Sequence, residues 1–281
     1  MTLLPFFLLL VAVLGLWVHR NFSLAALTLA VIAGYFTGAL ADTAALWIGV
    51  AGAMAWLHAT RRGLPRVATG FAFLLFAVAL GLLLLPGFPR TVVFESVVLS
   101  PGAMPYTLGL GFAKVVTGIF ILAFMHPGRV RSWGELGQVL ARVAPVFIAT
   151  AALVMVLTLA LGYVRWDAKW TPLFFAWALA NLFFTCLAEE AFFRGFVQRE
   201  LTQLGRNRRL SAALAIAVTS VFFGLVHLGG GWKYALAATL AGVGYGIAYH
   251  RTQRIEGSMA VHFGVNATHF LLFTYPALAP A

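Results

Sequence analysis

The sequence predicts an all-α, polytopic membrane protein: a transmembrane helical bundle of about ten helices. Of its 281 residues, 62% are hydrophobic and only 10% are charged, whereas soluble domains carry about a quarter charged residues. The mean hydropathy is +0.94, so a water-soluble fold would have to hide more apolar surface than its core could hold. Apolar runs recur along the whole chain, and many approach the roughly 20 residues that cross a bilayer.

Ten apolar segments account for most of the chain, and Pro or Gly marks several of the breaks between them. The first segment lacks the basic region and the small-residue cleavage site of a signal peptide, so we expect it to be retained as a helix. We expect the longest connection, 87–105, to be a loop that carries a short surface helix. The expected helices cover 2–18, 22–40, 43–58, 67–86, 106–125, 138–163, 171–195, 210–228, 233–250 and 258–275.

The basic residues alternate between the connections as the positive-inside rule requires. Thirteen of the 19 lysines and arginines lie in odd-numbered connections, and only Arg90, Arg165, Lys169 and Lys233 lie in even-numbered ones. We therefore expect a multi-pass protein of the cell (inner) membrane with both termini away from the cytoplasm. The net charge of +11 is explained by this orientation in the lipid bilayer, and no nucleic-acid partner is expected.

The first candidate functional motif is Glu189-Glu190-Ala191-Phe192-Phe193-Arg194, inside an apolar segment. Ionisable groups at membrane depth are costly and are therefore functional candidates. Glu190 and Arg194 are four residues apart on one helix face, where Arg194 would keep Glu190 ionised. Glu189 points about 100° away and remains for proton transfer, as a general base requires. The alternative interpretation is a structural buried ion pair with a spare glutamate.

Two histidine motifs follow on later helices: FGLVH, which ends at His227, and HFGVN, from His262 to Asn266. If residues 204–209 form the turn of a helical hairpin, Glu189 and His227 each lie about 25 Å from it, at 1.5 Å per residue. His262 and Asn266 share a helix face, and both can donate hydrogen bonds, as an oxyanion requires. A lone histidine at a helix end is otherwise most often a packing residue.

The depths of these residues predict a water-filled cavity. His262 lies only about 8 Å into the membrane beyond the 251–257 connection, at 1.5 Å per residue. Glu189 reaches the same level only if its helix continues past the membrane surface to Gln203. Residues 229–231, all glycine, would then lie within the bilayer, where irregular backbone must line protein or a water-filled cavity. We expect such a cavity, open to the cytoplasmic side.

The three motifs in this order, EExxxR, then FxxxH, then HxxxN, resemble the CAAX-protease and bacteriocin-processing (CPBP, or Abi) family of intramembrane endopeptidases. The resemblance covers roughly residues 171–275. It implies that Glu189 and His227 activate the attacking water, while His262 and Asn266 stabilise the oxyanion. It implies a membrane-tethered protein or peptide as the substrate. The residues that it places in supporting roles are Glu190, Arg194 and Phe223.

The resemblance leaves the role of a metal open, because the family is described both as metalloproteases and as metal-independent glutamate proteases. Glu189, His227 and His262 would form a carboxylate and two-histidine set that suits a divalent metal such as zinc. However, HExxH, the usual helix motif of zinc proteases, is absent from the sequence. A metal-free mechanism is therefore the preferred expectation.

The motifs divide the chain into two expected parts. Residues 1–165 would form N-terminal transmembrane helices for substrate or partner recognition, and residues 166–281 the catalytic helical core. Two other functions stay open: a proton-coupled secondary transporter with the acidic pair as a relay, and a non-catalytic immunity or scaffold protein. The two halves show no matching interrupted helices, which argues against the transporter, and the intact motif set argues against a decayed site.

Overall fold

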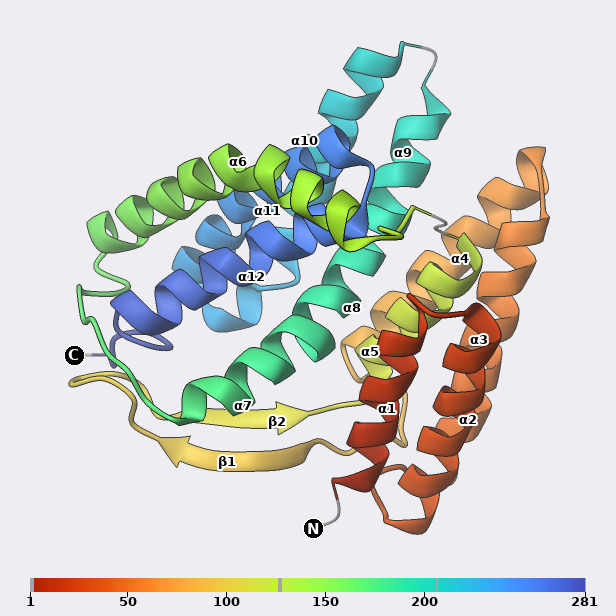
Figure 1. The fold of residues 1–281 in the computed structure, drawn as a ribbon, viewed down its shortest axis with the longest axis horizontal. Coiled ribbons are helices and arrows are strands. Elements are labelled where there is room, and N and C mark those ends of the chain that lie inside the picture. Colours follow the sequence, from red (N-terminus) through yellow and green to blue (C-terminus); the bar gives the residue numbers. More distant parts are fainter. Residues whose placement is uncertain (1–2, 126–127, 206, 281) are drawn as a thin grey trace. The chain divides into compact units, whose positions relative to one another are not determined.

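A computed structural model describes residues 3–125, 128–205 and 207–280, and helices dominate them (Figure 1). All ten predicted segments contain a helix, so the predicted all-α fold class is confirmed. Within these described ranges, three helices are long and apolar enough to cross a membrane: Gly63–Gly81, Trp133–Ala160 and Leu173–Leu204. Five further apolar helices have 10–17 residues, so the number of about ten crossings stays a prediction.

The chain divides into two compact units, each built from segments that are distant in the sequence. The first, here called the glutamate unit because it contains Glu189, comprises Met1–Val92, Gly109–Arg129 and Phe183–Phe196. The second, here called the histidine unit because it contains His227 and His262, comprises Val93–Leu108, Val130–Leu182 and Val197–Ala281.

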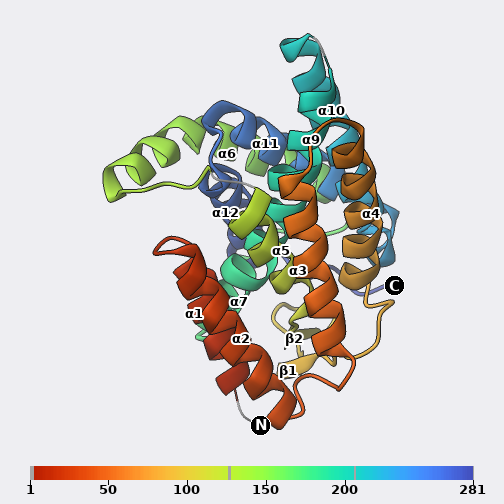
Figure 2. The ribbon, with the colours of Figure 1, turned by 90° about the vertical axis from the view of Figure 1, so that its right-hand side faces the viewer.

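Paired helices make up most of the glutamate unit (Figure 2). The Ser23 hydroxyl donates to the Ala12 carbonyl at 2.6 Å and joins the first pair. Gly118 brings two later helices into contact, because a Cβ there would lie 3.0 Å from Ala188 Cα. The helices are α1 (Leu4–Gly15), α2 (Arg20–Phe36), α3 (Ala44–Thr60), α4 (Gly63–Gly81) and α5 (Ala113–Phe120), with a π segment, η1, over Ile121–Met125.

The helix that carries the glutamate motif is continuous from Leu173 to Leu204 and has 32 residues. The predicted extension to Gln203 is therefore confirmed. Two π-helical segments interrupt its α-helical geometry. Its parts are α7 (Leu173–Ala180), η2 (Asn181–Cys186), α8 (Leu187–Glu190), η3 (Ala191–Gln198) and α9 (Arg199–Leu204).

Four helices form the histidine unit together with α7 and α9. Asn207 caps one of them by accepting from the backbone N–H groups of Arg209 and Leu210. This helix packs against α9, so the predicted helical hairpin is present, although residue 206 of its turn lies outside the described residues. The predicted irregular backbone at 229–231 is also present, because a 3-10 turn leads to Gly231 with φ +92°. The elements are α6 (Trp133–Ala160), α10 (Arg208–Leu225), η4 (Leu228–Gly230), α11 (Trp232–Thr252) and α12 (Ile255–Leu272).

The region around residues 87–112 differs from the prediction. The expected surface helix within 87–105 is wrong, because Thr91–Val97 is strand β1. The expected start of a helix at residue 106 is also wrong, because Tyr106–Leu110 is strand β2, which runs opposite to β1 (Figure 1). β-Branched and aromatic residues favour a strand over 91–94, and the glycines at 109 and 111 disfavour a helix before Ala113.

Candidate active site

Glu189 and Glu190 lie in α8, a four-residue α-helical stretch between the π segments η2 and η3. π-Helical segments inside α-helices are rare and are frequent at functional sites. Both carboxylates are buried, with exposures of 7% for Glu189 and 0% for Glu190. A buried carboxylate is costly unless an opposite charge or hydrogen bonds satisfy it, so the partners of each glutamate decide what it can do.

The predicted pair between Glu190 and Arg194 is present. Arg194 Nη1 donates to Glu190 Oε1 at 3.0 Å, and both side chains are fully buried. The guanidinium carbon also lies 5.7 Å from the centroid of the Phe193 ring. Loss of either partner of such a pair would leave an uncompensated buried charge, which is strongly destabilising.

Glu189 has a partner that the sequence analysis missed. Lys114 Nζ lies 3.3 Å from Glu189 Oε1, and it comes from α5, 75 residues earlier in the chain. The Lys114 side chain is 53% exposed, whereas that of Glu189 is 8% exposed. A signal was available: Lys114 lies in the middle of the predicted apolar segment 106–125, and a basic residue inside such a segment usually pairs with an acid.

Phe223 brings the two histidine motifs together within the histidine unit. Its ring centroid lies 4.5 Å from that of His227 and 5.8 Å from that of His262. His262 also stacks on Tyr245, with centroids 4.4 Å apart and an interplanar angle of 15°. The FxxxH motif of α10 and the HxxxN motif of α12 are therefore neighbours, with aromatic rings between and beside them.

A backbone hydrogen bond determines the tautomer of His227. Its Nδ1 lies 2.6 Å from the Phe223 carbonyl oxygen. Because a carbonyl can only accept, Nδ1 donates the hydrogen and Nε2 keeps its lone pair. An imidazole held in this way has the orientation and the basic nitrogen that a general base needs. The Tyr234 ring stands edge-on to the imidazole at 5.3 Å.

Asn266 has a polar neighbour on the helix that carries the glutamates. Asn266 Nδ2 donates to Asn181 Oδ1 at 3.2 Å, across 85 residues of sequence. Asn181 is the first residue of η2, and it was not predicted as a site residue, although an amide in an apolar segment is a signal of such a contact. His262, one turn before Asn266 on α12, is 3% exposed.

The comparison with protein families places these motifs in a known context. Residues 170–268 match the family described as "Type II CAAX prenyl endopeptidase Rce1-like". This region belongs to the Rce1-like family. The predicted resemblance to CAAX proteases is thereby confirmed, and all seven predicted site residues fall inside the matched range. Comparisons with curated proteins and with solved structures each give no significant match.

The matched family and the membrane-spanning helices together define the class of protein. The Rce1-like family is a family of proteases, and in the part of the chain that the structure describes three helices suit a membrane in length and composition. The chain is therefore an integral membrane protein that contains an Rce1-like region. The division into recognition and catalytic parts at residue 165/166 stays a prediction, as does the meeting of Glu189 with the histidines around one pocket of water.

Loop residues outside the matched range hold the C-terminal end of α12, the helix that carries His262 and Asn266, and we call this set of contacts the clasp. The backbone N–H groups of Asp167 and Lys169 donate to the Leu272 and Leu271 carbonyls at 2.9 and 2.8 Å. Lys169 Nζ also donates to the Asp167 carboxylate at 3.2 Å and to the Phe273 carbonyl. A hydrogen bond with Ser100, aided by Lys169, holds the pKa of Asp167 below its usual range.

The predicted metal set consists of one carboxylate and two imidazoles, all inside the matched range. The donor types of Glu189, His227 and His262 suit zinc, and the bond from His227 Nδ1 to a carbonyl would direct Nε2 to a metal. Among the described residues, however, no three His, Cys, Asp or Glu side chains gather as a metal-binding group. We derive no reaction step through a metal, and the metal set stays a prediction.

Proposed function

We propose that this protein is an intramembrane endopeptidase that hydrolyses a peptide bond of a membrane-tethered protein or peptide. The observation that carries the proposal is the match of residues 170–268 to a family of CAAX prenyl endopeptidases. That range contains the EExxxR, FxxxH and HxxxN motifs together. A chain that had lost the activity would have no reason to keep all three motifs.

In the proposed reaction, Glu189 and His227 activate a water molecule that attacks the scissile carbonyl carbon. As the C–O bond forms, the water proton passes to this pair, and the carbonyl oxygen becomes an oxyanion. His262 and Asn266 donate hydrogen bonds to the oxyanion. The tetrahedral intermediate then collapses, the C–N bond breaks, and the proton is returned to the leaving amine.

The contacts of His227, Glu189 and the Glu190–Arg194 pair support the roles that we propose for them. The bond from His227 Nδ1 to the Phe223 carbonyl leaves Nε2 to receive a proton. Lys114 provides a counter-charge beside Glu189 at 3.3 Å and orients its carboxylate. The Glu190–Arg194 pair keeps the neighbouring turn of the helix in one conformation.

The experiment that tests the proposal is cleavage of a membrane-tethered reporter peptide by the purified protein in liposomes. We expect Glu189→Gln and His227→Ala each to reduce the rate at least 100-fold, because general acid–base groups typically contribute 10²–10⁴-fold. Glu95→Gln and His250→Ala change exposed residues of the same types and should leave the rate unchanged. Full activity of Glu189→Gln would refute the mechanism.

The same assay addresses the metal and the alternative functions. A chelator arm with metal analysis decides between the glutamate and the metal-dependent mechanism: we expect activity to survive chelation. Ion-coupled uptake into the liposomes without any cleavage would favour the transporter. Normal biological function of a Glu189→Gln strain would instead favour the non-catalytic scaffold.

We also propose that both termini face away from the cytoplasm in the cell membrane. The charge bias of the connections supports this orientation. Trp166 and Trp170, each 65% exposed, favour a membrane interface at the connection between α6 and α7 on whichever side it faces, because tryptophan is enriched at both interfaces. The sole native cysteine, Cys186, is buried, so a maleimide should react only with a cysteine that is introduced at the surface. In intact cells an impermeant maleimide should label Ala168→Cys, and should label Arg209→Cys only after lysis.

A further inference from the structure

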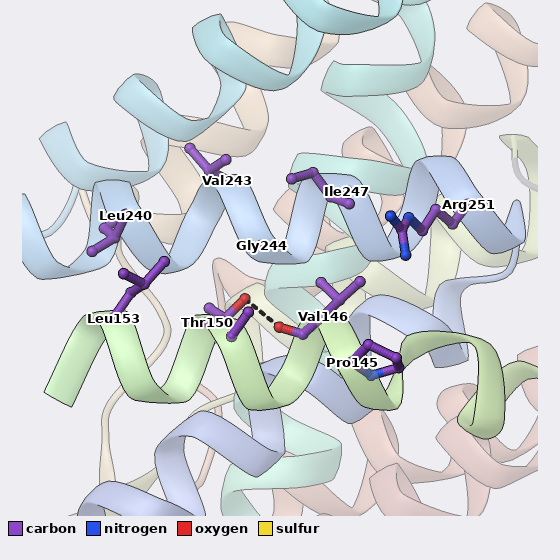
Figure 3. Close-up of a pocket in the computed structure, with 10 residues that line it drawn as sticks. Pro145, Val146, Thr150, Leu153, Leu240, Val243, Gly244, Ile247 and Arg251 are labelled. Carbon is purple, nitrogen blue, oxygen red and sulfur yellow. Dashed lines mark hydrogen bonds between the residues drawn. The ribbon is translucent and has the colours of Figure 1, made fainter. Parts of the chain in front are cut away.

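The histidine unit has a groove of about 270 Å³ between α6 and α11 (Figure 3). Its lining is apolar apart from Thr150 and Arg251. The Thr150 hydroxyl donates to the Val146 carbonyl of its own helix at 2.7 Å, so its hydrogen-bonding need is met. At the floor the two helices almost touch, since a Cβ on Gly244 would lie 2.0 Å from Thr150 Oγ1. Leu153, on the wall, is 58% exposed, so the groove is open along its side.

One end of the groove is positively charged. Arg251 lies at this end of α11, opposite Pro145 on α6 (Figure 3). Arg142 precedes Val146 by four residues, so it lies on the same face of α6 one turn further toward this end. The Arg251 side chain, which lines the groove, has no hydrogen bond or ion pair with another described residue. The acid at the start of α6, Glu135, is already bound by Arg254 Nε at 2.7 Å.

The dimensions of the groove suit one leaflet of a membrane. The α11 side runs from Leu240 to Arg251, which is about 16 Å at 1.5 Å per residue. The hydrocarbon core of a bilayer is about 30 Å thick, so the groove covers about half of it. A ligand that satisfies the whole groove has an anionic group at one end and a long apolar chain behind it.

We propose that this groove binds an anionic phospholipid, with an acyl chain along the α6–α11 seam and the phosphate at Arg251 and Arg142. Guanidinium groups recognise phosphate oxygens through paired, charge-assisted hydrogen bonds, and basic sites between membrane helices bind anionic head groups. The site shares no residue with the proposed peptidase site, so either proposal can fail without the other.

The test is native mass spectrometry of the full-length protein in detergent with equal amounts of phosphatidylglycerol and phosphatidylcholine of identical acyl chains. Both lipids carry the phosphate, but the positive choline of phosphatidylcholine is repelled by the two arginines. We therefore expect phosphatidylglycerol to be retained about tenfold more. Arg251→Gln should abolish this preference, whereas Arg209→Gln, an exposed arginine outside the groove, should keep it. Equal retention of both lipids, or an unchanged preference in Arg251→Gln, would overturn the proposal.

A second variant tests the acyl-chain part of the site. Ala149 lines the groove at an exposed position, so Ala149→Leu should fill the groove and weaken retention of both lipids about tenfold. Ala152→Leu adds the same side chain at an exposed position outside the lining and should have no effect. Glycerol 3-phosphate at the concentration of the lipid should not displace phosphatidylglycerol. Displacement by it, or normal retention in Ala149→Leu, would contradict an acyl-chain site.

Discussion

The carboxylate half and the imidazole half of the proposed site are built on different physical principles. In the glutamate unit, each carboxylate lies within 3.3 Å of a basic side chain, Lys114 for Glu189 and Arg194 for Glu190. In the histidine unit, the imidazoles are held by aromatic rings and one backbone carbonyl. Charged groups need a compensating charge when buried, whereas a neutral imidazole needs only shape and one hydrogen bond. The first half should therefore be sensitive to charge, and the second to ring shape.

The largest effect that would sharpen this comparison is expected at Arg194. Arg194→Met should destabilise the protein by about 3–5 kcal/mol, because it leaves Glu190 buried without its counter-charge. The double variant Glu190→Gln/Arg194→Met should recover most of that loss, since no charge is then left behind. Thermal unfolding in detergent measures both, with Arg209→Met as the exposed control. Equal destabilisation by the single and the double variant would show that shape, not charge, holds this half.

A change of ring shape at Phe223 should have the next largest effect. Phe223→Leu keeps an apolar side chain but removes the ring contacts with both histidines, at about 0.5–1.5 kcal/mol for each aromatic contact. We expect a stability loss of about 1–3 kcal/mol together with a fall in peptide cleavage. Phe71→Leu, at a ring that is 62% exposed, is the matched control. Cleavage at the wild-type rate in Phe223→Leu would show that the ring does not position the histidines.

Lys114 should affect activity more than stability, because its side chain is half exposed. Lys114→Met is expected to destabilise the protein less than Arg194→Met, because half of the Lys114 side chain is exposed to solvent, and to lower kcat for cleavage about tenfold through a misplaced Glu189. Lys114→Arg should restore part of kcat, because it keeps the positive charge. A higher KM in Lys114→Met, with kcat unchanged, would instead assign Lys114 to substrate binding.

The smallest effect concerns the clasp at the end of α12. Because the pKa of Asp167 is lowered by its bonds to Ser100 and Lys169, this group stabilises the fold above its unfolded pKa of about 3.9. The contribution is lost as the pH falls through the lower, folded value. The melting temperature of wild type should therefore fall more steeply below about pH 4 than that of Asp167→Asn. Parallel pH profiles for the two proteins, with Glu95→Gln as control, would contradict this account.

Much of the fold was predictable because helices are local structures. The ten apolar segments follow from composition over about 20 residues, and each contains a helix. The strands β1 and β2 were missed because their residues, such as Val92 and Val93, are also apolar, and a short apolar run does not distinguish strand from helix. The π segments were missed because they depend on one extra residue per turn, which composition does not encode.

For the site, the sequence by itself determined the motifs, the family resemblance and the Glu190–Arg194 pair. Residues four apart on a helix meet whatever surrounds them, which is why that pair could be predicted. Only the tertiary structure decided that Lys114 reaches Glu189, that Asn181 meets Asn266, and that Phe223 lies against both histidines. These contacts join residues far apart in the chain, and they depend on helix packing, such as the close approach of Gly118 to Ala188, which no local pattern specifies.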